Sequence, residues 1–376
     1  MTDRIQRYLK ENDIETPVLI MDLDVVEQNY RQLRDYLPLA RVFYAVKANP
    51  APQVVDRLCG LGSSFDTASR GEIELCMSQG VTAANISFGN TIKKEKDIAW
   101  AYGRGVRLFA FDSEAELQKL ARSAPGARVF CRVLVDCGGA EWPLSKKFGC
   151  SPEMARDLLL KARKWGLDPY GLSFHVGSQQ TDLEQWDRAL GRTSQLFFAL
   201  QEEGVELKMV NLGGGLPARY RSEVAGVKDY ALAIMRAMTN HFGNDLPEII
   251  IEPGRSMVGD AGIIQSEVVL ISKKDAAEKK RWVYLDIGKF GGMAETMDEA
   301  IKYRFRTKLD GRKSGPVIIA GPTCDSADIL YEKTEYKMPL DLKVGDKVEI
   351  LSTGAYTSSY SSVNFNGFAP LKTVCV

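Results

Sequence analysis

The 376-residue sequence predicts an α/β fold, a (β/α)8 barrel, joined to an all-β second domain. Two observations carry this prediction. Between residues 41 and 255, short apolar or alternating segments recur, and segments with helical spacing separate most of them. After residue 261, strand-like segments follow one another with few long helical patterns between them. Alternating strands and helices are typical of a barrel, and a doubly wound parallel sheet is the structural alternative.

Eight segments have the length and apolar character of barrel strands. They are 41–49, 63–69, 85–90, 106–112, 127–135, 170–178, 207–215 and 248–255. Two of the intervening segments open with clear helix-start signals. Ser113 is followed by acidic first-turn residues, and Ser151 is followed by a proline at the first helical position.

The β-rich domain is predicted from four further strands, at 263–272, 281–287, 316–320 and 346–352. The opening segment 15–22 is expected to add a strand to them. The domain limits are therefore expected at 24–261 for the barrel, with 1–23 and 262–376 forming the β-sheet domain.

Composition excludes several classes of protein. The 49 basic and 49 acidic residues give zero net charge, which predicts no nucleic-acid partner. No apolar run approaches the roughly 20 residues of a membrane span, and the first residues lack the apolar core of a signal peptide. Seven scattered cysteines without a CxxC pair fit reduced thiols in the cytoplasm, and two histidines offer no basis for a metal site.

A barrel collects its chemistry at the carboxyl ends of its strands. Lys47 lies near the end of the first predicted strand, and alternation places it on the same side as Phe43 and Ala45. An interior ammonium must be paired or lose its charge, and an imine with an aldehyde cofactor removes the problem. The ordinary alternative is a strand-end lysine that reaches solvent.

Two later strand ends carry groups suited to a phosphorylated pyridine. The glycines 213–215 allow backbone N–H groups to approach a phosphate, although glycine triplets also form plain turns. Arg255 suits a phosphate, and Glu252 suits a protonated pyridine nitrogen; a surface ion pair is the alternative.

The sixth strand ends at His175 and Ser178, an imidazole that can stack on a ring and a hydroxyl that can donate to a phosphate. Asp66 in the second strand and Arg132 in the fifth are expected at the same end. Together these residues describe a pyridoxal 5′-phosphate pocket. A core histidine is the alternative for His175.

The β-rich domain adds four candidates. Cys324 is adjacent to Asp325, which suggests a thiol that donates a proton. The alternative is an ordinary buried cysteine without a catalytic role. Tyr356 offers a phenol that could contact a phosphate or a substrate; the alternative is an aromatic side chain packed in a turn. Asp298 lies in an acidic segment that suits a cationic group; the alternative is a solvated helix face.

Six motifs, in order, resemble those of the fold-type III pyridoxal phosphate decarboxylases. They are FYAVKANP at 43–50, FHVGS at 174–178, GGGLP at 213–217, EPGR at 252–255, GPTCD at 321–325 and GAY at 354–356. The closing FNGF at 365–368 extends the resemblance over nearly the whole chain. Within that group the sequence is most similar to ornithine decarboxylases of the bacterial, eukaryote-like type.

The resemblance implies a role for each candidate. Lys47 would hold the cofactor covalently, Glu252 would face its pyridine nitrogen, and His175 would stack on its ring. The phosphate would be held by Ser178, Gly214, Gly215, Arg255 and Tyr356, with Asp66 and Arg132 lining the pocket. Cys324 would return a proton to the α-carbon, and Asp298 and Asp325 would bind the distal ammonium of the substrate.

The implied reaction is decarboxylation of L-ornithine to putrescine in polyamine biosynthesis, by a head-to-tail homodimer in which residues 324–325 complete the neighbour's pocket. A dual lysine/ornithine decarboxylase stays open, because one methylene is worth only about 1–3 kcal/mol. Diaminopimelate decarboxylase is disfavoured, since that family typically has glutamate where this chain has Asp325. An alanine-racemase-like enzyme and a non-catalytic homologue like the antizyme inhibitors are the remaining alternatives.

Overall fold

The computed structural model describes residues 2–135, 138–142 and 147–376. The chain divides into two compact units. A barrel unit comprises Glu27–Pro217 and Val224–Met257, and a β-rich unit comprises Met1–Val26, Ala218–Glu223 and Val258–Val376. The domain limits expected from the sequence stay a prediction. Cys137 lies outside the described residues, and Cys59, Cys76, Cys131, Cys150, Cys324 and Cys375 are free thiols.

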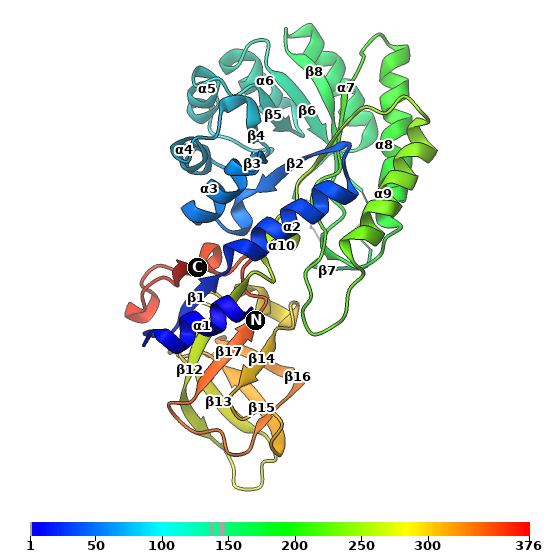
Figure 1. The fold of residues 1–376 in the computed structure, drawn as a ribbon. Helices are drawn as coiled ribbons and strands as arrows, with labels where there is room; N and C mark the ends of the chain where they lie inside the picture. Colours follow the sequence, from blue (N-terminus) through cyan, green and yellow to red (C-terminus); the bar gives the residue numbers. More distant parts are fainter. Residues whose placement is uncertain (1, 136–137, 143–146) are drawn as a thin grey trace. The chain divides into compact units, whose positions relative to one another are not determined.

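Eight parallel strands close the barrel unit into a ring (Figure 1). The strands are β2 (Ala40–Ala45), β3 (Ser64–Thr67), β4 (Ile86–Phe88), β5 (Leu108–Phe111), β6 (Arg128–Arg132), β8 (Asp168–Ser173), β10 (Met209–Asn211) and β11 (Glu248–Ile251). Closure through the pairing of β11 with β2 confirms the predicted barrel and excludes the doubly wound sheet. Each strand lies within or at the edge of a predicted segment.

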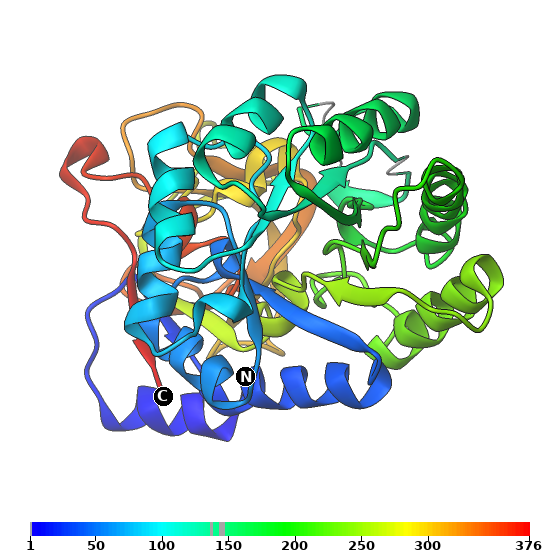
Figure 2. The same ribbon diagram turned by 90° about the horizontal axis from the view of Figure 1, so that it is seen from above.

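Helices lie outside the ring of strands in the view of Figure 2. They are α3 (Pro52–Gly60), α4 (Arg70–Ser78), α5 (Glu95–Gly103), α6 (Glu114–Ser123), α7 (Pro152–Lys164), α8 (Gln185–Glu202) and α9 (Val227–Phe242), with α2 (Leu23–Tyr36) before the first barrel strand. The predicted caps are present: Ser113 accepts a hydrogen bond from the N–H of Glu116, and Ser151 from that of Met154.

The barrel interior is apolar in its middle and polar at the carboxyl ends of its strands. Phe43, Leu108, Ala110, Phe130, Met209 and Ile250 form the buried apolar cluster. Because side chains alternate along a strand, the residues two positions beyond Phe130, Met209 and Ile250 point to the same side. Those residues are Arg132, Asn211 and Glu252. The two-residue period of the strands therefore places a layer of polar and charged side chains directly beyond the apolar layer.

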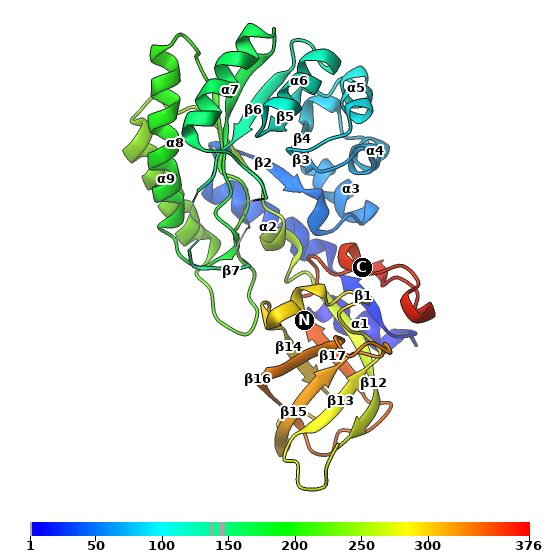
Figure 3. The same ribbon diagram turned by 180° about the vertical axis from the view of Figure 1, so that it is seen from behind.

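The β-rich unit is built on one sheet with the strand order β14-β17-β12-β13-β15-β16 (Figure 3). Its strands are β12 (Gly262–Ser272), β13 (Arg281–Leu285), β14 (Arg304–Thr307), β15 (Ser314–Ala320), β16 (Ile329–Pro339) and β17 (Lys347–Leu351). β1 (Val18–Met21) joins them by pairing with β12 and with β18 (Lys372–Cys375). Helix α1 (Asp3–Glu11) packs Ile5 on Val18, Ile20 and Ile263.

Strands β12, β13, β15, β17 and β1 were expected from the sequence, whereas β14, β16 and β18 were not. In β16 four charged residues interrupt the apolar pattern, and β14 and β18 have only four residues each. Such segments lack the apolar alternation on which strand prediction depends. Among the described residues, no helix has both the length and the apolar character needed to cross a bilayer.

Candidate active site

Lys47 lies in a short turn, not in the strand predicted for 41–49. Strand β2 ends at Ala45, and the 3-10 turn Val46–Ala48 follows it. The N–H of Asn49 closes this turn on the carbonyl of Val46 at 3.1 Å, and the Tyr44 hydroxyl donates to the Asn49 carbonyl at 2.9 Å. These hydrogen bonds take the place of a continued strand ladder.

The turn leaves the Lys47 amine accessible and paired. Its side chain is 47% exposed, and its Nζ lies 3.5 Å from Oδ2 of Asp66, whose side chain is 5% exposed. Asp66 is opposite Ala45 in the register of β2 and β3, so it faces the barrel interior. The structure therefore brings the predicted lysine and the predicted aspartate together.

Asp66 is also confined from the other side. A Cβ added to Gly89, the residue after β4, would lie 1.9 Å from Asp66 Oδ1, so any larger residue would displace this carboxylate from its present position. That Oδ1 atom is buried and has no hydrogen-bond partner among the described residues. A buried carboxylate oxygen without a donor is an acceptor available to a bound group.

Glu252 follows β11 at the same end of the barrel. Burial and, next, the charge of Asp66 raise the pKa of Glu252 to about 7, although Lys47, Asn211 and Arg132 oppose this shift. The Asn211 amide donates to Glu252 Oε1 at 2.5 Å, and its own oxygen accepts from the N–H of Gly213 at 2.9 Å. The carboxyl group is therefore oriented and close to its titration point at neutral pH.

His175 is held as a neutral imidazole. Burial and the nearby positive charges of Arg132 and Lys47 lower the pKa of His175 well below its usual value of 6.5. The N–H of Gly177 donates to His175 Nδ1 at 3.0 Å, so the ring proton of the neutral form is on Nε2. A neutral, oriented ring of this kind is suited to stacking on an aromatic ligand.

The glycine triplet approaches backbone so closely that side chains are excluded. An added Cβ at Gly213 would lie 2.2 Å from the Phe174 carbonyl oxygen, and at Gly214 2.7 Å from that of Glu252. At Gly215, where φ is +108°, it would lie 2.7 Å from the Gly177 carbonyl oxygen. The loop therefore depends on glycine for both space and conformation.

Arg255 lies beside this loop with only 3% of its surface exposed. Its Nε and Nη2 donate to Ser178 Oγ at 3.2 and 3.0 Å. Ser178 begins β9 (Ser178–Gln180), which pairs with β7 (Ala140–Trp142), and Gln180 donates its N–H to the Gly215 carbonyl at 2.9 Å. A buried guanidinium, a hydroxyl and a glycine backbone are a donor set suited to a phosphate.

Sequence reasoning missed two polar residues here. Asn211 orients Glu252, as described above. Burial raises the pKa of Glu72, with Asp66 raising it further and Lys47 lowering it, so Glu72 belongs to the same charged group. The sequence held a signal for Glu72 in the Ser-x-x-Glu spacing of a helix start at 69–72; in the structure Ser69 caps α4, and the Glu72 carboxylate accepts from the N–H of Ala68 at 2.6 Å.

In the β-rich unit, Cys324 and Asp325 lie exposed on the loop after β15. The buried carboxylate of Asp328 fixes this loop. It accepts from the N–H and hydroxyl of Thr323 at 3.1 and 2.7 Å and from the N–H of Lys289 at 2.7 Å. The N–H of Cys324 donates to Asn366 Oδ1 at 3.0 Å, which joins the GPTCD and FNGF motifs.

Asp298 lies in a turn of unusual backbone conformation, and the carboxylate of the next residue, Glu299, fixes this turn to β16. Asp298 and Glu299 both have positive φ, at 52° and 54°. The Glu299 carboxylate accepts three backbone N–H groups of β16, from Glu332, Lys333 and Thr334, at 2.8, 2.7 and 2.6 Å. These bonds lower the pKa of Glu299 to about 2 against the effect of burial.

Tyr356 also has a positive φ, 54°, and its ring centroid lies 5.9 Å from that of Tyr360. A cavity of about 360 Å³ in the same unit is bordered by the GPTCD segment and by the FNGF segment that contacts it. Its lining includes Pro322, Thr323, Phe365 and Phe368, with Glu15 and Asp286 among the polar residues.

The comparisons with known proteins agree with this geometry. Residues 23–259 match the model of the pyridoxal-dependent decarboxylases, pyridoxal binding domain. The chain is 37% identical over 363 residues to the lysine/ornithine decarboxylase of Selenomonas ruminantium, covering 96% of this chain and 90% of that protein. The chain therefore belongs to the pyridoxal-dependent decarboxylases, in the group that acts on basic amino acids.

Solved structures show the same fold along the whole chain. The lysine decarboxylase of Selenomonas ruminantium with pyridoxal phosphate and cadaverine is 34% identical, with a TM-score of 0.89 over 100% of this chain and 94% of that one. The lysine/ornithine decarboxylase of Vibrio vulnificus with cadaverine is 32% identical, with a TM-score of 0.88 over 99% and 97%. The predicted cofactor, pyridoxal phosphate, is thereby confirmed for the family.

The residues present fit that cofactor. Asp66 offers a buried acceptor without a donor, Arg255 supplies a buried cation, and the glycine loop presents backbone N–H groups without side chains. The accessible amine of Lys47 lies at the same end of the barrel, as its 3.5 Å contact with Asp66 shows.

Proposed function

We propose that this protein decarboxylates L-ornithine to putrescine and CO2 in polyamine biosynthesis, with pyridoxal phosphate attached to Lys47. The observation that carries the proposal is the contact of an accessible lysine amine with a buried aspartate, in one charged group with Glu252 and His175. When bound, pyridoxal phosphate supplies an electron sink for the negative charge that CO2 leaves at the α-carbon.

Glu252 would hold the proton of the pyridine nitrogen, for which a carboxyl group of pKa about 7 is well suited. His175 would stack on the ring, with Asp66 and Arg132 lining the pocket. Ser178, Gly214, Gly215, Arg255 and Tyr356 would hold the phosphate. The buried Arg255–Ser178 contact and the glycine loop support this assignment.

Cys324 would return a proton to the α-carbon, and Asp298 and Asp325 would bind the distal ammonium of the substrate. All three side chains are on exposed segments, which leaves them accessible to a ligand. Two carboxylates and no arginine at these positions suit a substrate whose far end is only cationic.

L-Lysine is the second candidate substrate, because the Selenomonas and Vibrio relatives carry both amino acids in their names. Diaminopimelate has a distal carboxylate that needs a cationic partner, and neither Asp298 nor Asp325 supplies one. A non-catalytic homologue is not favoured, since Lys47, Gly215, Glu252, Arg255 and Cys324 are all present.

A carbon dioxide release assay with ornithine, lysine, arginine and diaminopimelate tests the proposal. We expect the highest kcat/KM for ornithine, with lysine within about 200-fold, the range that one methylene allows. A higher kcat/KM for lysine would replace ornithine as the substrate. A colourless, cofactor-free protein that releases no CO2 would favour the non-catalytic homologue.

We also propose a head-to-tail homodimer in the cytoplasm, with residues 324–325 completing the neighbour's site. The free thiols fit a reducing compartment. Mixing the inactive Lys47→Ala protein with the Cys324→Ala protein, whose protonation step is impaired, tests the shared site through formation of the expected diamine. Random exchange makes half of the dimers mixed, each with one intact site, so about a quarter of the wild-type activity should return. No recovery after verified subunit exchange would place both residues in one subunit's site.

A further inference from the structure

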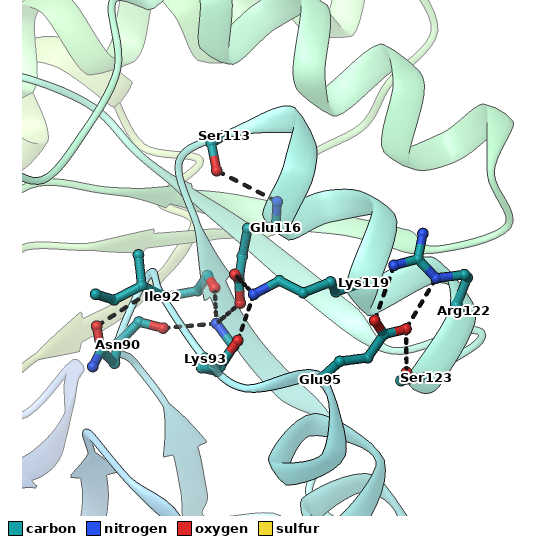
Figure 4. Close-up of polar contacts among 10 residues, drawn as sticks. Asn90, Ile92, Lys93, Glu95, Ser113, Glu116, Lys119, Arg122 and Ser123 are labelled. Atoms are coloured by element: carbon teal, nitrogen blue, oxygen red, sulfur yellow. Dashed lines mark hydrogen bonds and ion pairs between the residues drawn. The ribbon is translucent and has the colours of Figure 1, made fainter.

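A fully buried lysine lies outside the residues assigned so far. Lys93 is on the loop of residues 89–94 between β4 and α5, and its side chain is 0% exposed. Its ammonium donates to the carbonyls of Asn90 and Ala110 at 2.7 and 2.6 Å (Figure 4). It also lies 3.1 Å from Glu116 Oε1 and 5.5 Å from the centroid of the Phe88 ring.

The charge of Lys93 is balanced within the barrel unit. Glu116, whose side chain is 3% exposed, is in the first turn of α6 and binds Lys93 through one oxygen and Lys119 through the other. Lys119 also donates to the backbone carbonyl of Lys93 (Figure 4). Burial lowers the pKa of Lys93 to about 8, while Glu116 and, more weakly, Asp112 oppose the shift and Lys119 adds to it.

Such a buried pair is costly to maintain, because desolvation removes much of the gain from the ion pair. Apolar residues of similar volume would stabilise the fold as well or better. The ammonium does something that an apolar side chain cannot do: it donates two hydrogen bonds and forms an ion pair, and so joins Asn90 in the loop to Ala110 in β5 and Glu116 in α6.

The loop that Lys93 fixes is the one that confines Asp66. The N–H of Gly89 donates to the Thr67 carbonyl at 3.0 Å, and the Asn90 amide donates to that of Ala68 at 3.2 Å. Gly89 packs so closely on Asp66 that a Cβ would lie 1.9 Å from Oδ1. Asp66 in turn lies 3.5 Å from the Lys47 amine.

We propose that Lys93 is a positioning residue: by joining the carbonyls of Asn90 and Ala110 to Glu116, it holds Gly89 against Asp66 and so fixes the Asp66–Lys47 pair. This inference rests on the proposed function, because it assigns Lys93 the task of supporting two residues of the proposed site. Lys93 itself contacts neither substrate nor cofactor in this assignment.

Lys93→Met tests the proposal, because methionine keeps the apolar stem and leaves Glu116 paired with Lys119. The first measurement is amide hydrogen exchange in the cofactor-free protein. We expect the Gly89 amide to exchange at least about 10-fold faster, with the amides of α7 unchanged, since the loop loses its attachment. Lys96→Met, on the exposed surface of α5, is the control: it replaces a nearby lysine but leaves the Asn90, Ala110 and Glu116 contacts of Lys93, so exchange at Gly89 should stay within about 2-fold.

The second measurement is a double-mutant cycle with Asp66→Asn in the holoenzyme. If Lys93 acts through Asp66, Lys93→Met should lower kcat/KM by about 10-fold in the wild type and by less than about 2-fold in the Asp66→Asn background. Equal losses in both backgrounds, or unchanged exchange at Gly89, would overturn the proposal.

The two readouts separate this inference from the proposed function. If Asp66→Asn leaves activity unchanged, the assignment of Asp66 to the site is wrong, and with it the functional part of the inference, whereas hydrogen exchange still decides whether Lys93 fixes the loop. Lys93→Gln retains a donor and should give intermediate values in both measurements. It carries the test if Lys93→Met does not fold.

Discussion

The two units of this protein fix their candidate site residues in different ways. In the barrel unit, Arg132 and Glu252 follow the strand period from a buried apolar layer, and burial, together with neighbouring charges, raises the pKa of Glu252 and lowers that of His175. In the β-rich unit, Cys324, Asp325 and Asp298 lie on exposed loops and turns. There a neighbouring carboxylate, Asp328 or Glu299, accepts hydrogen bonds from backbone N–H groups and fixes the conformation of the loop or turn.

This difference separates two requirements of the chemistry. A charged cofactor site needs groups whose protonation is set by burial, and a closed barrel provides that environment. Groups that meet an incoming substrate need accessibility with a defined backbone, and a loop fixed by a local carboxylate provides that instead. Substitutions in the two units should therefore fail in different ways, and four predictions test this contrast.

The largest effect is expected for Lys47→Ala. Removal of the only group assigned to covalent cofactor attachment should lower kcat at least about 1,000-fold and abolish the visible absorbance band. The fold should persist, because the lysine side chain is 47% exposed. Lys96→Ala, on the exposed surface of α5, is the control and should retain activity. Substantial turnover by Lys47→Ala would remove this residue from its assigned role.

Glu252→Gln should separate function from stability. We expect kcat to fall by about 100-fold, because glutamine cannot hold the pyridine proton as a carboxylate does. A carboxyl with a raised pKa favours folding most below its ordinary value of 4.5, and this contribution is lost as the pH rises through about 7.

The cofactor-free Glu252→Gln protein should therefore be more stable than the wild type above pH 7, by on the order of 2 kcal/mol, and the difference should shrink towards pH 5. Urea unfolding of the cofactor-free proteins at pH 5 and pH 8 measures this directly. A less stable variant at pH 8 would mean that the carboxylate is compensated there by its neighbours.

The same contrast explains how far the sequence alone could go. The barrel was predictable because its strands repeat one apolar pattern, and the candidate site residues of the barrel unit were inferred from the ends of those strands. Lys47 shows the limit of this reasoning. Alternation placed it in a strand, but a turn closed by hydrogen bonds of Asn49 follows Ala45, and the strand period does not show where the strand ends.

In the β-rich unit the pattern carried less information. Strand β16 contains four charged residues, Glu332, Lys333, Glu335 and Lys337, which interrupt its apolar pattern. The register of this strand is fixed by its pairing with β15. The roles of Asp328 and Glu299 were not predictable, because Asp328 accepts from the turn at Lys289 and Glu299 accepts from strand β16, and such contacts leave no local signal in the sequence. Glu72 differs, because the Ser-x-x-Glu spacing at 69–72 is a helix-start signal that the sequence itself shows.

Cys324→Ala should have a smaller effect than either barrel substitution. Without the thiol, protonation of the α-carbon should slow by about 10- to 100-fold and release products other than the expected diamine. Product analysis by mass spectrometry measures this outcome together with the rate of CO2 release. Cys59→Ala, in α3 of the barrel unit, is the matched thiol control and should give normal products. Normal products from Cys324→Ala would assign the proton to another donor.

The smallest effect is expected for Glu299→Gln. The carboxylate accepts three N–H groups of β16, and an amide would set its own N–H donors against at least one of them. We expect a loss of about 1 kcal/mol at pH 7, a value discounted for the partial exposure of Glu299. Glu335→Gln, an exposed carboxylate on the same strand, is the control and should change stability by less than about 0.5 kcal/mol.

The pH dependence distinguishes a clamp from a general packing effect. A carboxyl whose pKa is lowered to about 2 contributes stability that is complete above its ordinary value of 4.5 and is lost as the pH falls towards 2. The difference between wild type and Glu299→Gln should therefore be constant from pH 5 to 8 and narrow below pH 4. A difference that persists unchanged at pH 3 would show that the charge of Glu299 does not hold the turn at Asp298, and the contrast between the two units would then rest on Asp328 alone.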